Sequence, residues 1–213
     1  MTQETRIMLV DDHAVVRAGV RRLLEQQSGF SVVAEAESGE RAYQLFGEHL
    51  PDIIIMDLSM PGMGGMEAIR RIIARYPAAR VLVLSMHENA AFASQAMKSG
   101  AKGYLAKSGL AEELVGALVS LARGQTYISP DVAKKIALQT LQGSDDPIAQ
   151  LSAREFEIFR LLAEGQDSEA IARALKISGK TVANYQTIIK QKLGINNPVE
   201  LVRLAIRYGV IDS

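Results

Sequence analysis

The sequence feature that most constrains the fold is a series of short apolar runs separated by segments with helical periodicity. The runs occupy residues 7–11, 31–36, 53–56, 81–85 and 103–106. Between them, apolar residues recur at spacings of three and four, which predicts helices at about 13–27, 38–48, 65–75, 90–98 and 111–123. The runs do not alternate with polar residues, as expected for strands covered by helices on both faces. The pattern therefore predicts an α/β fold with a parallel sheet.

Polar side chains stand at the ends of four of these runs. They are Asp11 and Asp12, Asp57, Ser85 and Lys107. Because groups just past the carboxyl ends of parallel strands converge on one crevice of an open sheet, we expect these side chains to meet. Crowded carboxylates repel one another and favour a bound cation, and a set of oxygen ligands favours Mg²⁺.

This set of groups fits phosphoryl transfer to a carboxylate. Mg²⁺ and Lys107 would offset the three negative charges, so that Asp57 could attack a phosphorus atom as a nucleophile. Each residue alone also has an ordinary interpretation, because an acidic pair often caps a helix and a lysine after a strand is often a solvated charge. His13, His49 and His87 show no metal-ligand spacing, and we predict no zinc site there. The phosphoryl interpretation is favoured because all of its parts occur together.

Length and composition limit the other possibilities. The chain has 213 residues, which favours two domains. It contains no Cys, which excludes disulfides and thiolate metal sites. No apolar run approaches the roughly 20 residues that span a bilayer, and residues 1–5 lack the features of a signal peptide. We therefore expect a soluble, cytoplasmic protein without a membrane partner.

The pattern changes after Gly124. A short helix is predicted from Ser129 and Pro130 through Leu141, and residues 142–147 are typical of a flexible polar joint. Everything that follows is helical in character.

Local signals locate the helices of this second part. Ser152 and Glu155 form a capping box, and Asn197 precedes Pro198 as an N-cap does. Between them we predict a helix near 168–175, a turn at 176–178 and a longer helix at about 179–193. Two helices joined by a tight turn indicate a helix-turn-helix.

Charge is unevenly distributed along the chain. The total is zero, yet residues 176–207 hold six basic side chains and one acidic side chain, a net of +5. Residues 1–125 hold 13 basic and 14 acidic side chains, a net of −1. A local basic stretch can bind nucleic-acid phosphates whatever the total charge is, although a solvated helix face is the ordinary alternative.

At this level of detail the chain resembles a two-component response regulator of the NarL/FixJ subfamily over nearly its whole length. The receiver motifs are Asp11-Asp12, Asp57, Pro61-Gly62, Ser85, and Gly100 to Leu105 ahead of Lys107. The LuxR-type helix-turn-helix motifs are Leu151 to Glu155, Ala163-Glu164-Gly165, Ile171-Ala172, Ser178, Thr181-Val182 and Lys192-Leu193-Gly194.

The resemblance implies a fold and domain limits. The fold is a doubly wound, five-stranded parallel sheet of flavodoxin-like order 2-1-3-4-5, followed by an all-α, four-helix domain. The receiver domain would span residues 1–124, a linker with a short helix 125–149, and the DNA-binding domain 150–213.

It also implies roles at the phosphoryl site. Asp57 would accept the phosphoryl group, and Mg²⁺ would be bound by Asp11, Asp12, Asp57 and the backbone carbonyl of Ser59. Ser85 and Lys107 would bind the phosphoryl group, and Tyr104 would be the aromatic switch. The chain departs from the usual receiver pattern at Ser108, where many receivers have proline, and at Gly64.

For DNA, the resemblance implies contacts from the helix at 179–193. The expected contact residues are Lys180, Thr181, Ala183, Asn184, Thr187, Lys190 and Lys192, whereas Val182, Tyr185, Ile188, Ile189 and Leu193 are expected in the core. The implied function is transcription regulation controlled by phosphorylation, without enzymatic turnover. The implied partners are a sensor histidine kinase, double-stranded promoter DNA, a second copy of the chain after phosphorylation, and RNA polymerase as a further candidate.

Two alternatives stay open from the sequence. A net charge of only +2 for residues 151–213 leaves room for a phosphorylation switch whose helical domain binds protein instead of DNA. An enzyme with an aspartyl-phosphate intermediate would need a second acid two residues after the nucleophile, where this chain has Ser59.

Overall fold

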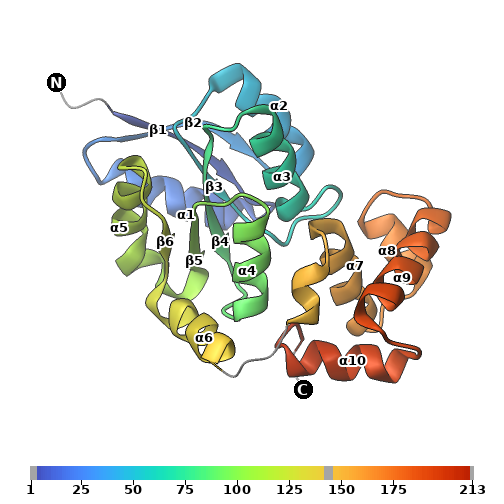
Figure 1. Cartoon of the computed structure of the whole chain (residues 1–213). Coiled ribbons are helices and arrows are strands. Elements are labelled where there is room, and N and C mark those ends of the chain that lie inside the picture. The colour runs from blue at the N-terminus through green and yellow to red at the C-terminus, as the bar shows by residue number, and fades with distance from the viewer. Residues whose placement is uncertain (1–3, 142–145, 212–213) are drawn as a thin grey trace. The chain divides into compact units, whose positions relative to one another are not determined.

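The computed structural model describes residues 4–141 and 146–211 (Figure 1). Of the polar joint predicted at 142–147, residues 142–145 lie outside the described part. The chain divides into two compact units, residues 1–88 with 96–130 and residues 89–95 with 131–213.

The first unit is built on a parallel sheet. Its strands are β1 (Thr5–Val10), β2 (Phe30–Ala36), β3 (Ile53–Met56), β4 (Arg80–Ser85), β5 (Gly103–Ala106) and β6 (Tyr127–Ile128). They lie in the order β2-β1-β3-β4-β5-β6, and every neighbouring pair is parallel. The predicted order 2-1-3-4-5 is confirmed, and one further strand extends the sheet beyond β5.

Helices cover both faces of this sheet. They are α1 (Ala14–Glu25), α2 (Gly39–His49), α3 (Gly65–Arg75) and α5 (Leu110–Ala122), with a 3-10 turn at Lys107–Gly109. Helix α4 (Ala90–Lys98) follows β4 and is divided between the two units, since residues 89–95 belong to the second. Helices α1 and α5 pack on the strand residues that point to one face, such as Ile7, Ile55 and Leu84. Successive strand residues point to opposite faces, and both sets are buried here, which explains why the runs do not alternate with polar residues.

The short strand β6 was not predicted, because its residues fall in the segment expected to be a linker. The backbone N-H of Tyr127 donates to the carbonyl of Lys102 (3.1 Å), and that of Ser129 donates to the carbonyl of Tyr104 (2.9 Å). The Tyr127 hydroxyl donates to Glu113 Oε2 on α5 (2.6 Å). Two residues are too few to show periodicity, so this pairing leaves no pattern in the sequence.

Besides the first part of α4, the second unit contains the helices that follow β6. They are α6 (Pro130–Leu141), a 3-10 turn at Pro147–Gln150, α7 (Ala153–Ala163), α8 (Ser168–Ala174), α9 (Gly179–Leu193) and α10 (Pro198–Arg207). Each of α7 to α10 begins after a polar N-cap whose side chain accepts a hydrogen bond from a backbone N-H in the first turn; these caps are Ser152, Asp167, Ser178 and Asn197. The capping box of Ser152 and Glu155 is confirmed. These caps fix where the helices start.

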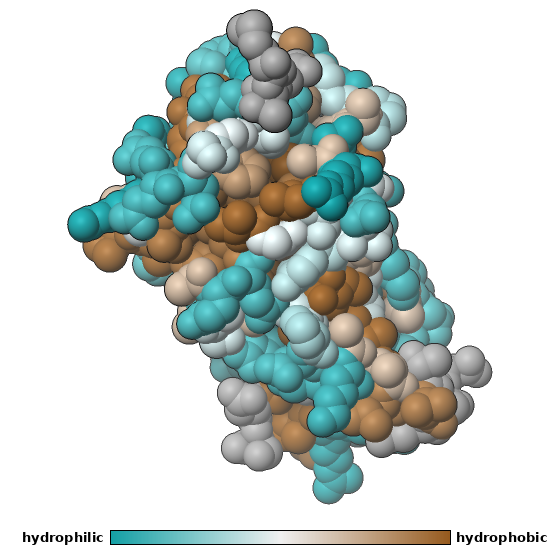
Figure 2. All heavy atoms as spheres, turned by 90° about the vertical axis from the view of Figure 1, so that its left-hand side faces the viewer, coloured by the Kyte–Doolittle hydropathy of each residue, from teal (hydrophilic) through white to brown (hydrophobic). Residues whose placement is uncertain are grey.

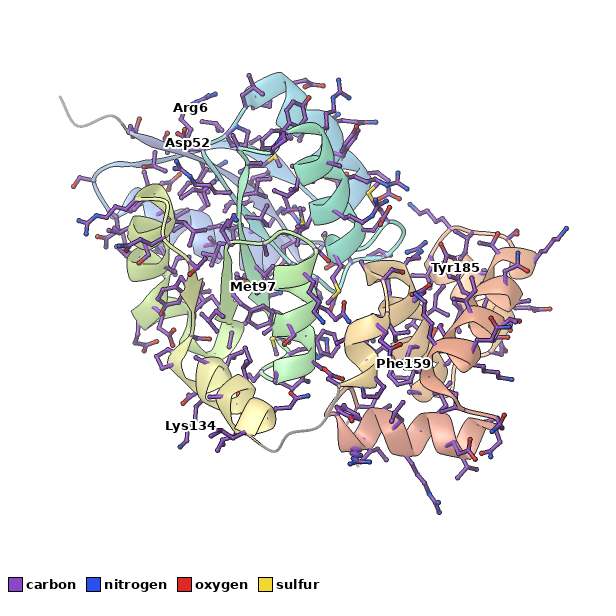
Figure 3. All side chains as sticks on the ribbon, in the orientation of Figure 1. Arg6, Asp52, Met97, Lys134, Phe159 and Tyr185 are labelled. Carbon is purple, nitrogen blue, oxygen red and sulfur yellow. The ribbon has the colours of Figure 1, made fainter. Side chains whose placement is uncertain are left out.

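One core prediction in α9 is wrong. Val182 and Ile189, one heptad apart, are fully buried, whereas Ile188 is 37% exposed. Consecutive helix residues point about 100° apart, so Ile188 leaves the buried face that Ile189 occupies. Figure 3 shows Tyr185 on α9 and Phe159 on α7 within this helical unit.

No helix of the described residues is long and apolar enough to cross a membrane. The face in Figure 2 carries hydrophilic side chains over most of its area, with hydrophobic ones visible between them.

A side chain also links the amino ends of β1 and β3, at the opposite end of β3 from Asp57. The backbone N-H of Arg6 donates to Asp52 Oδ2 (2.8 Å; Figure 3).

Candidate functional site

Acidic side chains gather at the carboxyl ends of β1 and β3. Ligand atoms of Asp11, Asp12, His13 and Asp57 all lie within 4.8 Å of one another. The backbone accounts for this convergence, because the N-H of Asp57 donates to the carbonyl of Val10 (2.8 Å) and continues the pairing of two adjacent strands. The acidic pocket is consistent with a metal site, since it offers several oxygen ligands in a small volume.

The ammonium group of Lys107 enters this pocket from the end of β5. Lys107 Nζ lies 2.7 Å from Asp11 Oδ2 and 3.4 Å from Asp57 Oδ1. The side chains of Asp11 and Asp57 are 6% and 2% exposed, so water contributes little to their solvation. One lysine against three carboxylates leaves an excess of negative charge that a divalent cation would offset.

The surroundings of Asp57 disfavour the ionised form of its carboxyl group. Burial raises its pKa above the usual value for aspartate, Lys107 acts in the opposite direction, and the neighbouring Asp11 raises it further. The backbone N-H of Leu58 donates to Asp57 Oδ1 (2.9 Å), and the backbone N-H of Ser59 donates to the same carboxylate. A buried charge with few compensating partners gains most from a cation or from covalent modification.

Gly65 allows α3 to begin directly behind the acidic side chain. Its backbone N-H donates to the carbonyl of Leu58 (3.1 Å). A Cβ atom at Gly65 would overlap the carbonyl oxygen of Asp57 and lie 2.7 Å from Leu58 Cα. Only glycine permits this close approach of the helix to the Asp57 backbone.

Ser85 and Tyr104 both hold the segment that follows β4. Ser85 Oγ accepts a hydrogen bond from the backbone N-H of His87 (3.1 Å), and the Tyr104 hydroxyl donates to the His87 carbonyl (2.6 Å). Tyr104 is completely buried, and burial raises the pKa of its phenol, which therefore stays protonated as a donor. Next to this segment, Ser108 Oγ donates to Glu88 Oε1 (2.6 Å). A change at Ser85 would thus reach the same backbone segment that Tyr104 holds.

His13 is a member of the acidic cluster that the sequence analysis missed. Its Nδ1 lies 2.9 Å from Asp12 Oδ1 and 3.1 Å from Asp11 Oδ1. Ligand spacing among the histidines gave no indication of this. The available signal was its position directly after the acidic pair.

The residues expected to contact DNA differ in their surroundings. Ala183, Asn184 and Thr187 are exposed on α9, as are Lys180 and Lys190.

The other two expected contact residues have bonds within the helical unit. Lys192 Nζ donates to Glu155 Oε2 (2.6 Å) and to the carbonyl of Gln150 (3.2 Å). Burial opposes ionisation of Glu155, but hydrogen bonds from Lys192 and Ser152 outweigh it and lower the pKa of this carboxyl below its usual value. Thr181 is half-buried, and its Oγ1 lies 2.8 Å from Ser178 Oγ.

A buried aspartate with a nearby lysine at the edge of a flavodoxin-like sheet, in one chain with a helix-turn-helix, defines a phosphoryl receiver coupled to a regulatory domain. Residues 7–119 match the family described as "Response regulator receiver domain", and residues 149–205 match "Bacterial regulatory proteins, luxR family". The chain belongs to the response regulators with a LuxR-type helix-turn-helix, which are transcription factors and not turnover enzymes.

Relatives match this chain over nearly its full length and theirs. The chain is 39% identical to the response regulator UvrY of Escherichia coli K12 over 209 residues, which cover 97% of this chain and 96% of UvrY. It is 39% identical to the response regulator GacA of Pseudomonas aeruginosa over 210 residues, which cover 98% of each. Among solved structures, RcsB of Salmonella enterica, bound to promoter rprA in the presence of the phosphomimetic BeF3−, aligns with a TM-score of 0.71 and 28% identity. That alignment covers 95% of this chain and 98% of RcsB.

Proposed function

We propose that Asp57 is the phosphoacceptor of this response regulator and that Asp11, Asp12, Asp57 and the carbonyl of Ser59 hold Mg²⁺. The supporting observation is the convergence of three carboxylates and one ammonium group at a single edge of the sheet. The ligands are hard oxygen donors, as Mg²⁺ prefers. When bound, the cation would neutralise charge on the phosphoryl oxygens and on the carboxylates.

The other steps of phosphoryl transfer are carried out by side chains of the protein. A carboxylate oxygen of Asp57 attacks phosphorus while the bond between phosphorus and the donor's nitrogen or oxygen breaks. The ammonium group of Lys107, 3.4 Å from Asp57, stabilises the charge on the transferring oxygens. Ser85 donates its hydroxyl hydrogen to the new phosphoryl group and keeps its oxygen close to the backbone of His87. Tyr104 responds because its hydroxyl is bound to that same segment.

The regulator binds promoter DNA through its LuxR-type domain. We assign base contacts to Ala183, Asn184 and Thr187, which are exposed on one face of α9, and phosphate contacts to Lys180 and Lys190. In helix-turn-helix domains the second helix lies in the major groove with its N-terminal residues against base edges. Thr181 and Lys192 contribute mainly by fixing the start and the end of α9.

The partners follow from this assignment. A sensor histidine kinase would donate the phosphoryl group, in the cytoplasm, where the DNA is. RcsB has been solved as two dimers bound to two parallel DNAs, and we propose that this chain also dimerises on DNA after phosphorylation. RNA polymerase would then be the partner that interacts with the DNA-bound regulator.

Labelling with a small phosphoryl donor tests the assignment of Asp57. The wild type should become labelled in the presence of Mg²⁺, and Asp57→Asn should not. Asp52→Asn is a matched control, because Asp52 lies at the opposite end of β3 and bonds the backbone of Arg6. Equal labelling of the wild type and Asp57→Asn would show that another residue accepts the group.

A further inference from the structure

Most of the exposed residues of α9 form one continuous face. Six of them, Lys180, Ala183, Asn184, Thr187, Ile188 and Gln191, recur at spacings of three and one, as neighbours on one side of a helix do. Gly179, Lys190 and Lys192 are the other exposed residues of α9, and Lys190 borders this face. Val182 and Ile189 lie on the buried side. Lys180 and Gln191 stand at the ends of this face, so its centre consists of residues 183, 184, 187 and 188.

The centre of this face offers few hydrogen-bond donors. The Thr187 hydroxyl donates to the carbonyl of Ala183 (3.1 Å), so its hydrogen is used within the helix. Ala183 and Ile188 present only carbon, and the exposed Asn184 is the side chain at the centre with an amide that can donate and accept. Guanine shows two acceptors in the major groove and is usually bound by arginine or lysine. Neither residue type occurs among the four residues at the centre of this face.

Carbon atoms of the centre match a different feature of DNA. The C5-methyl group of thymine is an apolar group displayed in the major groove, and adenine offers the paired donor and acceptor that an Asn amide can bind. Ile188 is 37% exposed on the helix that a helix-turn-helix inserts into this groove. Packing against a methyl group would remove this β-branched side chain from water.

We propose that Ile188 determines DNA specificity by packing against a thymine methyl group, with Ala183 and the Thr187 methyl extending the same apolar surface. This inference rests on the proposed base contacts of α9 and adds a residue that the sequence had assigned to the core. Asn184 reads an adjacent adenine. The operator half-site therefore contains A·T pairs at the positions that face the centre of α9.

Deoxyuridine substitution tests the role of Ile188. Duplexes that bind the phosphorylated full-length protein are first selected from a random pool, and each thymine is then replaced singly by deoxyuridine, which lacks only the methyl group. The wild type should lose about fourfold in affinity at the contacted thymine, the value of one buried methyl group. Ile188→Ala should bind the thymine and deoxyuridine duplexes equally, and Ile188→Val should retain part of the difference.

Ile206→Ala provides the matched control. Ile206 is an isoleucine of α10 with a similar exposure of 40%, so its truncation removes the same atoms from a different helix. The ratio between thymine and deoxyuridine affinities should stay at the wild-type value in this variant.

The possible failures are distinguishable. If no duplex is selected, the DNA contacts proposed for α9 fail together with this inference. If duplexes are selected but the wild type binds thymine and deoxyuridine equally at every position, or if Ile188→Ala keeps the wild-type ratio, only the role of Ile188 is overturned.

Discussion

At the scale of single residues, the acidic pocket combines side chains that destabilise one another. Asp57 has almost no exposure to water and lies close to Asp11 and Asp12, while Lys107 is the one ammonium group that reaches both Asp11 and Asp57 among the described residues. An ion pair removed from water returns little net stability, because desolvation offsets the attraction. The pocket therefore favours ligand binding and lowers the stability of the folded state.

Replacing the proposed phosphoacceptor should accordingly stabilise the fold. Asp57→Asn removes a buried charge whose pKa is raised by burial, while the shape of the side chain is kept. We expect a higher midpoint of thermal unfolding than in the wild type without divalent cations. Added Mg²⁺ should raise the midpoint of the wild type by more than that of the variant. A midpoint for Asp57→Asn below that of the wild type would contradict this account of the pocket.

Gly65 gives a second prediction at this scale. A methyl group there would overlap the Asp57 carbonyl, so Gly65→Ala should lower the free energy of unfolding by roughly 3 kcal/mol or more. Gly116, inside α5 with open space around its Cα, is the matched control. Gly116→Ala should raise the free energy of unfolding by about 0.5–1 kcal/mol, because alanine favours helix. Urea unfolding of both variants measures the difference in sign.

Residue-level prediction from sequence worked where the backbone dictates the position of a side chain. Asp57 and Lys107 follow strands, and a parallel sheet aligns the ends of its strands, so their meeting could be expected. His13 lies in the cluster because of the path of the loop after β1. Ile188 lies outside the core because of the direction in which its position on α9 faces. Lys192 bonds Glu155, 37 residues away, which its basic charge alone could not indicate. These outcomes depend on tertiary geometry that periodicity does not encode.

At the scale of elements, β6 ties the segment after α5 to the strand that carries Tyr104. The backbone bond from Ser129 to Tyr104 and the side-chain bond from Tyr127 to Glu113 hold it in place. Long strands and helices were predictable because their patterns repeat and their caps are local. A strand of two residues depends on the free edge of β5 and on one tyrosine, so only the folded sheet reveals it.

The bond between Tyr127 and Glu113 should contribute stability that depends on pH. Burial, followed by Glu113, raises the pKa of Tyr127 from 10.0 to about 12. A raised pKa gives stability that is fully present below pH 10 and is lost as the pH rises through about 12. Tyr127→Phe should therefore lower the free energy of unfolding by about 1 kcal/mol at pH 8, and by less above pH 10. Urea unfolding across this range measures the difference, and a difference independent of pH would argue against the bond.

At the scale of the whole molecule, the proposed phosphoryl site and the proposed DNA-contact helix α9 belong to separate compact units. The first 125 residues carry a net charge of −1 and residues 176–207 carry +5, so DNA attraction is concentrated in the helical part. A response regulator with this division requires a coupling free energy between its two sites. Such coupling is reciprocal, because each ligand must change the affinity of the other by the same factor.

Reciprocity can be measured with the phosphomimetic BeF3−, which is present in the RcsB structure with promoter DNA. We expect BeF3− with Mg²⁺ to tighten the binding of a selected duplex by about tenfold, within the usual range for allosteric coupling. Saturating duplex should then tighten BeF3− binding by the same factor. Asp57→Asn should reduce both factors to one, whereas Ile188→Ala should weaken the duplex and leave the coupling intact. If neither ligand changes the affinity of the wild type for the other, phosphorylation acts on a partner other than DNA. A ligand with equal affinity for two conformational states does not shift the equilibrium between them.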